Sequence, residues 1–218
     1  PLARVNTSQL VASVAGRADN RAMQPRRDEP THCEVCGDEI AATPPIRLAD
    51  LRVCLPCQRG DQRVAKERWG LASDMHYKAS GHRTSEHYSL EIKRPTFVEA
   101  FARFEREGRS KRGWFGRLLS KRDPEVGDED FDESVFIDAD PGAEESTLEV
   151  LGEPTLRRAV AALVELGCEV HLTGQAVWIY DRDDGIGAIS DIAEVEPLAT
   201  ALAVLLERYA RGELPVAS

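Results

Sequence analysis

Two C-x-x-C pairs constrain the fold of this chain more than any other feature of its sequence. Cys33 and Cys36 form the first pair, Cys54 and Cys57 form the second, and 17 residues separate the pairs. Two pairs at this distance can place four sulfur atoms around one tetrahedral Zn²⁺. Because the protein would fill all four coordination positions, none remains for water. The spacing therefore predicts one structural zinc ion and no catalytic one.

The residues around the cysteines favour a metal site over the alternative of a redox dithiol. Gly37 follows the first pair and permits a tight turn whose backbone N–H groups face the thiolates. Pro56 suits the first turn of a helix, and the dipole of such a helix favours anionic sulfur in the second pair. A redox C-x-x-C normally occurs once, whereas these two pairs flank an expected hairpin at residues 46–53. Paired cysteines of this kind are typical of a reducing compartment, so we expect a cytoplasmic protein.

The tight turn at Cys33–Gly37, which we call the knuckle, is followed by the hairpin and the helix. This order resembles the treble-clef zinc finger of the DksA/TraR C4-type family. The resemblance covers about residues 31–69 and rests on the segments CEVCGDEI and VCLPCQ. It implies a C4 zinc finger at residues 31–70, with Zn²⁺ as its cofactor. Family members of the DksA kind act on RNA polymerase through a long coiled coil before the finger. Residues 1–32, interrupted by Gly16 and Pro25, do not match that coiled coil, so the resemblance implies the metal site and the finger fold alone.

Composition divides the rest of the chain into three further parts. Residues 1–30 are polar and interrupted by glycine and proline, which predicts a flexible arm. Residues 71–86 are rich in Ser, Gly, Asp and His, which predicts a linker. Residues 87–213 combine short strand patterns with amphipathic helices, so we expect an α+β domain with a short antiparallel sheet and packed helices. Residues 87–211 also resemble uncharacterised bacterial α+β domains, which implies a shape without an assigned activity.

Apolar periodicity predicts the elements of the α+β domain. Phe97, Phe101 and Phe104 recur at helical spacing, which predicts a helix there. The other expected elements are strands at residues 87–94 and 134–138, a hairpin of residues 169–173 and 176–181, and helices that begin near Pro154 and Asp191.

The expected hairpin creates a first candidate partner surface. Its two-residue loop, Gly174-Gln175, has glycine first and suits a type II′ turn. The resulting register places three aromatic side chains on the face opposite the apolar one, namely His171, Trp178 and Tyr180. Two interpretations stay open, because such a strip is either covered by its own chain or left exposed. If it is exposed, it is the expected surface for a partner or for dimerisation.

A basic stretch provides a second candidate surface. Residues 52–122 carry 17 basic and 8 acidic side chains, whereas residues 123–218 carry 5 basic and 23 acidic ones. Eight of the basic residues lie between Arg103 and Arg122. Either this stretch meets anionic lipid or nucleic-acid phosphate, or its aromatic residues pack internally while its arginines face the acidic half. In the first case the partner surface would include Arg109, Lys111, Arg112, Trp114 and Arg117.

The remaining sequence offers no case for an enzyme. It has no phosphate-binding loop, no G-x-S-x-G and no H-E-x-x-H motif, and no apolar run approaches the ~20 residues of a membrane span. We therefore expect a zinc-binding, non-enzymatic interaction module whose partner is a protein. The alternative is a transcription or nucleic-acid-associated regulator that uses the finger and the basic stretch. A regulator that contacts phosphates would bind with a steep dependence on salt.

Overall fold

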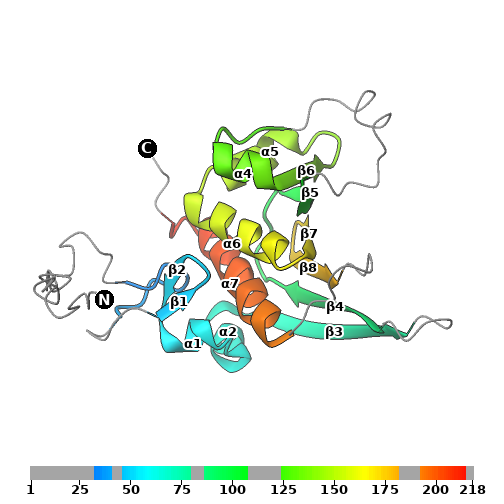
Figure 1. Ribbon diagram of the computed structural model, residues 1–218. Helices are drawn as coiled ribbons and strands as arrows, with labels where there is room; N and C mark the ends of the chain where they lie inside the picture. The colour runs from blue at the N-terminus through cyan, green and yellow to red at the C-terminus, as the bar shows by residue number, and fades with distance from the viewer. Residues whose placement is uncertain (1–31, 41–45, 80–85, 108–123, 182–191, 215–218) are drawn as a thin grey trace, which may run out of the picture.

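The structure is a computed structural model, shown in Figure 1. It has an α+β architecture, as expected: a two-stranded sheet near the cysteines and a six-stranded antiparallel sheet, with helices packed between and around them. The predicted flexible arm at residues 1–30 lies outside the described residues. The described residues are 32–40, 46–79, 86–107, 124–181 and 192–214.

The cysteine-bearing segment, which we call the finger (residues 32–70), contains a short hairpin followed by two helices. The hairpin pairs Ile46 with Val53, in the place expected from the sequence. Asp61 begins the second helix by accepting hydrogen bonds from the backbone N–H groups of Arg63 and Val64, and Gly70 ends it at φ +70°. The finger elements are β1 (Ile46–Leu48), β2 (Leu51–Val53), α1 (Leu55–Gln58) and α2 (Gln62–Trp69).

The rest of the described chain, which we call the sheet domain, is built on six strands in the spatial order β3-β4-β8-β7-β5-β6, and all neighbouring strands are antiparallel. The strands are β3 (Ala72–Ala79), β4 (Glu86–Lys93), β5 (Phe101–Arg106), β6 (Val135–Ala139), β7 (Cys168–Thr173) and β8 (Ala176–Asp181). The helices are α4 (Glu129–Ser134), α5 (Glu144–Leu151), α6 (Pro154–Glu165) and α7 (Ile192–Ala210).

The β7–β8 hairpin has the register that the sequence predicts. Leu172 pairs with Val177, and His171 pairs with Trp178. Gly174 supplies the positive φ (+58°) that the two-residue loop requires. The strands at β4 and β6 and the helices α6 and α7 also lie where periodicity placed them. Strict alternation of apolar and polar residues therefore predicts this part of the fold well.

Two predicted segments are wrong. Residues 72–79 of the expected linker form the edge strand β3, which pairs with β4 from Ala72–Lys93 to Ala79–Glu86. An edge strand tolerates polar residues because one of its sides faces solvent, so its composition is typical of a loop. Phe101 and Phe104 belong to the strand β5 instead of a helix. Spacing of three places their side chains on opposite faces of the sheet, and only Phe104 is fully buried.

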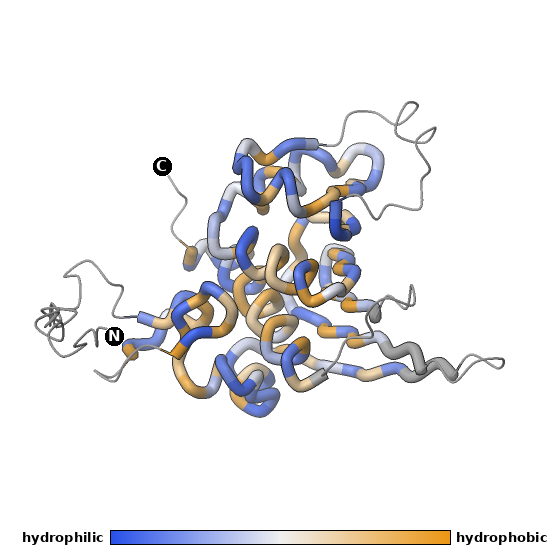
Figure 2. Tube along the Cα trace, in the orientation of Figure 1, coloured by the Kyte–Doolittle hydropathy of each residue, from blue (hydrophilic) through white to orange (hydrophobic). Residues whose placement is uncertain are grey.

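One face of the sheet, which we call the inner face, is covered by helices. The helix α6 packs on β5 and β7, and α7 packs on β4 and β8. The apolar residues of these two central helices stand out in Figure 2. The buried residues of the finger, among them Val35, Leu51 and Trp69, belong to the same hydrophobic cluster as those of the sheet domain. The finger is therefore packed against the sheet domain through a common core.

Candidate metal centre

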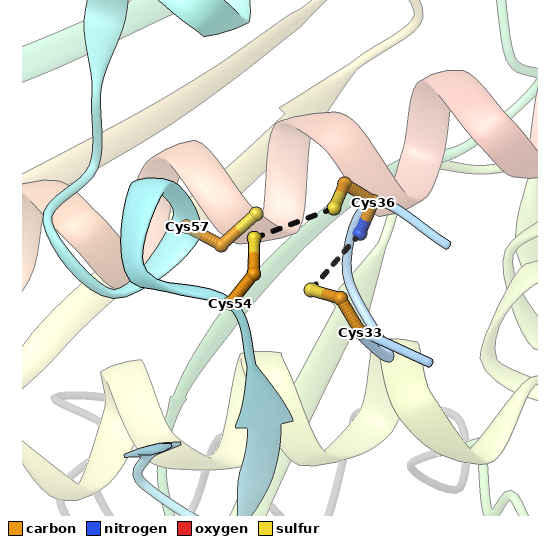
Figure 3. Close-up of side chains that lie close together, drawn as sticks. All are labelled: Cys33, Cys36, Cys54 and Cys57. Atoms are coloured by element: carbon orange, nitrogen blue, oxygen red, sulfur yellow. Dashed lines mark hydrogen bonds between the residues drawn. The ribbon is translucent and has the colours of Figure 1, made fainter. Parts of the chain in front are cut away.

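Four sulfur atoms converge in the finger. The Sγ atoms of Cys33, Cys36, Cys54 and Cys57 all lie within 4.8 Å of one another. Figure 3 shows the side chains pointing toward a common centre from two separate segments. The Sγ atoms of Cys36 and Cys54 are 3.6 Å apart. Four thiolates bound to Zn²⁺ at about 2.3 Å would be separated by about 3.8 Å, so this cluster can hold one tetrahedral metal ion.

Local backbone geometry positions the first pair. Gly37 adopts φ +79° and its N–H donates to the carbonyl oxygen of Cys33 at 2.8 Å, which closes the turn. The backbone N–H of Cys36 donates to the Sγ of Cys33 at 3.4 Å. This is the arrangement expected of a knuckle, in which an N–H group stabilises negative charge on sulfur.

The start of α1 positions the second pair. Cys54 is the residue that precedes the helix, Pro56 lies in its first turn, and Cys57 follows one residue later. The C-x-x-C spacing across a helix start places both sulfurs on the side of the first pair. The hairpin β1–β2 joins the two pairs, so the four ligands come from the two ends of one short, closed segment.

The electrostatics of the cluster favour a bound cation. Hydrogen bonds from Cys36 and Cys57 lower the pKa of the Cys33 thiol far below its usual range. The bond to Cys33 raises the pKa of Cys36, and bonds to Cys33 and Cys36 together with burial raise that of Cys57. One ionised thiol thus disfavours ionisation of its neighbours. A divalent cation provides the positive charge with which all four thiolates can coexist.

Two arginines contact the knuckle directly. Arg68 donates to the carboxylate of Asp38 at 2.6 Å and to the carbonyl oxygen of Cys36 at 3.2 Å. The Arg68 guanidinium lowers the pKa of Asp38, whose carboxylate lies 3.4 Å from the Sγ of Cys36. Arg208, on α7, donates to the carbonyl oxygens of Glu34 and Val35 at 3.1 and 2.9 Å. Sequence reasoning did not single out either arginine, because neither belongs to the cysteine motif.

Further contacts attach the finger to α6 and α7. Arg158 of α6 forms an ion pair with Glu34 at 2.7 Å. Gln62 donates to the hydroxyl oxygen of Thr200 at 2.9 Å. At Gly60 the chain passes so close to α7 that a Cβ atom there would lie 2.8 Å from the Cα of Pro197. The cysteine cluster is therefore adjacent to the helices that support the six-stranded sheet.

The structure also brings together the ring-bearing residues of the predicted partner surface. Trp178 and Tyr180 are parallel, with ring centroids 6.0 Å apart and an angle of 7° between their planes. The ring centroids of His171 and Tyr180 are 4.7 Å apart, and the Nε2 of His171 is 2.6 Å from a carboxylate oxygen of Glu169. The sequence missed one member of this group: His76, assigned to the linker, lies 5.8 Å from Trp178.

The proposed contact residues of the basic stretch lie outside the described part of the chain: Arg109, Lys111, Arg112, Trp114 and Arg117. Cys168, the remaining cysteine, is buried in β7, forms no disulfide and takes no part in the cluster.

Comparisons with protein-family models, with curated proteins and with solved structures find no match. The resemblance of the finger to the DksA/TraR family therefore stays a prediction. Among the described residues, no helix is both long and apolar enough to span a membrane.

Proposed function

We propose that this chain is a non-enzymatic protein in which one structural Zn²⁺ organises a scaffold for binding another protein. The observation that carries the proposal is the convergence of the four cysteine sulfurs within 4.8 Å, at the junction with α7. Protein sulfur would fill every position of a tetrahedral ion, which is the pattern of a structural site.

The residues of the chain would hold the ion as follows. Cys33 and Cys36 bind from the knuckle, and Cys54 and Cys57 bind from the start of α1. When bound, Zn²⁺ supplies the charge that keeps four thiolates together. The N–H of Cys36 then stabilises the sulfur of Cys33 from the second coordination sphere.

The size of the finger supports a structural role for the ion. A segment of roughly forty residues buries too little apolar surface to be stable alone. The finger hairpin has only three residues in each strand, and α1 has no buried residue. Metal binding couples to folding in such segments, so the ion would stabilise the finger and its contacts with α6 and α7.

A reducing compartment suits this role. None of the five cysteines forms a disulfide, and four of them converge in the finger. Zinc thiolates of this kind require reduced cysteines, which favours the cytoplasm. A protein partner is proposed because half-buried rings and charged residues gather on the sheet face opposite α6 and α7.

Elemental analysis of purified protein tests the proposal. The chain should contain about one zinc when it is purified under reducing conditions without chelators. Cys36→Ser should lose the metal, because it removes one of the four ligands. Cys168→Ser is the matched control: it makes the same chemical change at a buried cysteine outside the cluster and should keep the zinc. A zinc content near zero in the unaltered protein, or equal loss in both variants, would refute the proposal.

A further inference from the structure

The face of the sheet opposite α6 and α7 carries a continuous row of functional side chains. Direct cross-strand pairs link Asp74 to Glu91, Glu91 to Trp178, Trp178 to His171, His171 to Arg103 and Arg103 to Asp138. The row crosses all six strands, so it is about 24 Å long at the usual strand spacing. An extended peptide of about seven residues has this length. We call this face, with its neighbours His76, Lys93, Glu105, Glu169 and Tyr180, the outer face.

Aromatic rings occupy the middle of the outer face. Trp178 stacks with His76 on one side and with Tyr180 on the other, and all three rings are accessible to some extent. The protein uses its other described tryptophan differently. Trp69 is buried, and the guanidinium groups of Arg68 and Arg211 lie 5.0 and 5.2 Å from its ring centroid. Within the described chain no guanidinium lies over Trp178, so its ring remains available for such a contact.

Charge on the outer face is predominantly negative. Among the side chains that the structure describes there, two are basic, Lys93 and Arg103. Arg103 lies within 4 Å of three carboxylates, at 3.2 Å from Asp138, 3.7 Å from Glu169 and 3.9 Å from Glu105. Lys93 lies 3.2 Å from Glu91 and 3.8 Å from Asp74. Five carboxylates against two basic groups leave an excess of negative charge around the rings: Asp74, Glu91, Glu105, Asp138 and Glu169.

We propose that the outer face binds an arginine-bearing basic segment of a partner protein, a proposal that rests on the proposed function as a protein-binding scaffold. A guanidinium is planar, stacks on aromatic faces and forms paired hydrogen bonds with carboxylates. Arg103 shows that the face already holds one guanidinium among carboxylates. The stacked rings and the surrounding acids would hold further guanidinium groups in the same way.

The charge of the outer face argues against other occupants. Nucleic acid would bring phosphates toward five carboxylates, and the repulsion would oppose the stacking of bases on the rings. A second copy that used the same face would place like charges opposite each other across a two-fold axis. A basic segment is the one class of macromolecule for which both the rings and the acids are favourable.

Fluorescence anisotropy with a labelled eight-residue peptide of alternating arginine and glycine tests the proposal on the zinc-loaded full chain. The chain should bind this peptide more tightly than the matched lysine–glycine peptide, and should not bind the glutamate–glycine peptide. Trp178→Ala should weaken binding about tenfold, whereas Trp178→Phe should stay within about threefold of the unaltered chain. Circular dichroism should show that both variants are folded.

A charge variant provides an independent readout. Asp74 and Asp138 lie at the two ends of the row, and their side chains are 61% and 27% exposed. Asp74→Asn with Asp138→Asn should weaken peptide binding by about threefold or more, with a smaller dependence on salt. Glu67→Gln with Glu145→Gln changes the net charge equally at exposed positions of α2 and α5 and should leave binding unchanged.

Several results would overturn the proposal. One is equal peptide binding by all variants, and another is Trp178-dependent binding of oligouridine in place of the peptide. A third is peptide binding that appears only when the six basic residues between 109 and 122 are replaced by glutamine. That result would mean that the chain's own basic segment, and not a partner, occupies the face in the unaltered protein. Failure of peptide binding by a chain with full zinc content would reject this inference and leave the zinc site intact. A zinc content near zero in a chain that still binds the peptide would instead reject the metal site and leave this inference intact.

Discussion

The finger and the sheet domain are held in place by different interactions. In the finger, four cysteines converge on one point, and arginines from α2, α6 and α7 contact the backbone and carboxylates around them. In the sheet domain, fully buried residues such as Phe104, Leu163 and Ile179 form the interface between one sheet face and two helices. We therefore expect the short finger to depend on a metal ion and polar contacts, whereas burial stabilises the larger domain.

The largest effect is expected in the core of the sheet domain. Phe104 in β5 is fully buried, so Phe104→Ala leaves a cavity and should lower the free energy of unfolding by about 3–5 kcal/mol. Chemical denaturation would measure the change. The folded fraction should still carry one zinc per chain, because all four cysteines belong to the finger and none to β5. Loss of zinc from the folded fraction would show that the sheet core controls the metal site.

The next effect concerns the hydrogen bonds that attach the finger to α7. Arg208→Met removes two hydrogen bonds to the carbonyl oxygens of Glu34 and Val35 and should cost about 1–3 kcal/mol. Arg63→Met is the control, because Arg63 is 83% exposed and its pair with Glu67 on the same helix contributes about 0.5 kcal/mol or less. Denaturation midpoints that fall equally in the two variants would mean that α7 does not support the finger.

A similar effect is expected at the close approach of the finger to α7. Gly60 has φ +59° and no room for a Cβ atom beside Pro197, so Gly60→Ala should cost about 1–3 kcal/mol. Gly142 has φ +89° with no atom within 4 Å of a built Cβ, so Gly142→Ala incurs the backbone cost alone, about 1 kcal/mol. Thermal melts of the two variants should therefore differ. Identical melts would show that the finger moves away from α7 without loss of stability.

The smallest effect is a change in the pKa of Tyr180 on the outer face. Burial, together with Glu169 and Glu91, raises the pKa of Tyr180 above its usual value. The folded protein therefore retains this proton where the unfolded chain releases it, so the resulting stability is present below the unfolded pKa and is lost as pH rises through the folded one. Glu169→Gln should lower the pKa of Tyr180 in an absorbance titration. The pKa of Tyr209, which burial and Glu149 raise, should not change in this variant. An unchanged pKa of Tyr180 would mean that Glu169 does not influence it.

The sequence predicts those features that depend on neighbouring residues. The spacing of the four cysteines predicts their convergence because it suits one tetrahedral ion. The β7–β8 register follows from one glycine-led loop and strict alternation, which fixes the faces of His171 and Trp178. These features were predictable because each is determined within about twenty residues.

The missed features depend on residues far apart in the chain. The strand β3 is polar because it lies at an edge, so only its pairing with β4 distinguishes it from a linker. Arg158 and Arg208 contact finger residues 124 and 173 positions away, and no local pattern indicates such contacts. His76 joins the outer face only because β3 exists. Without the pairing of distant strands, the second half of the candidate surface could not be predicted.

Hydrogen–deuterium exchange of the zinc-loaded and the chelator-stripped protein tests most directly whether a metal ion holds the finger while burial holds the sheet domain. Removal of zinc should abolish protection of the backbone N–H groups of Cys33, Glu34 and Gly37, which form hydrogen bonds only in the ordered finger. The amides of β7 and β8 should keep their protection, because these strands pair with each other and pack on α6 and α7. Finger amides that stay fully protected without zinc, or strands that lose protection together with the finger, would contradict this division.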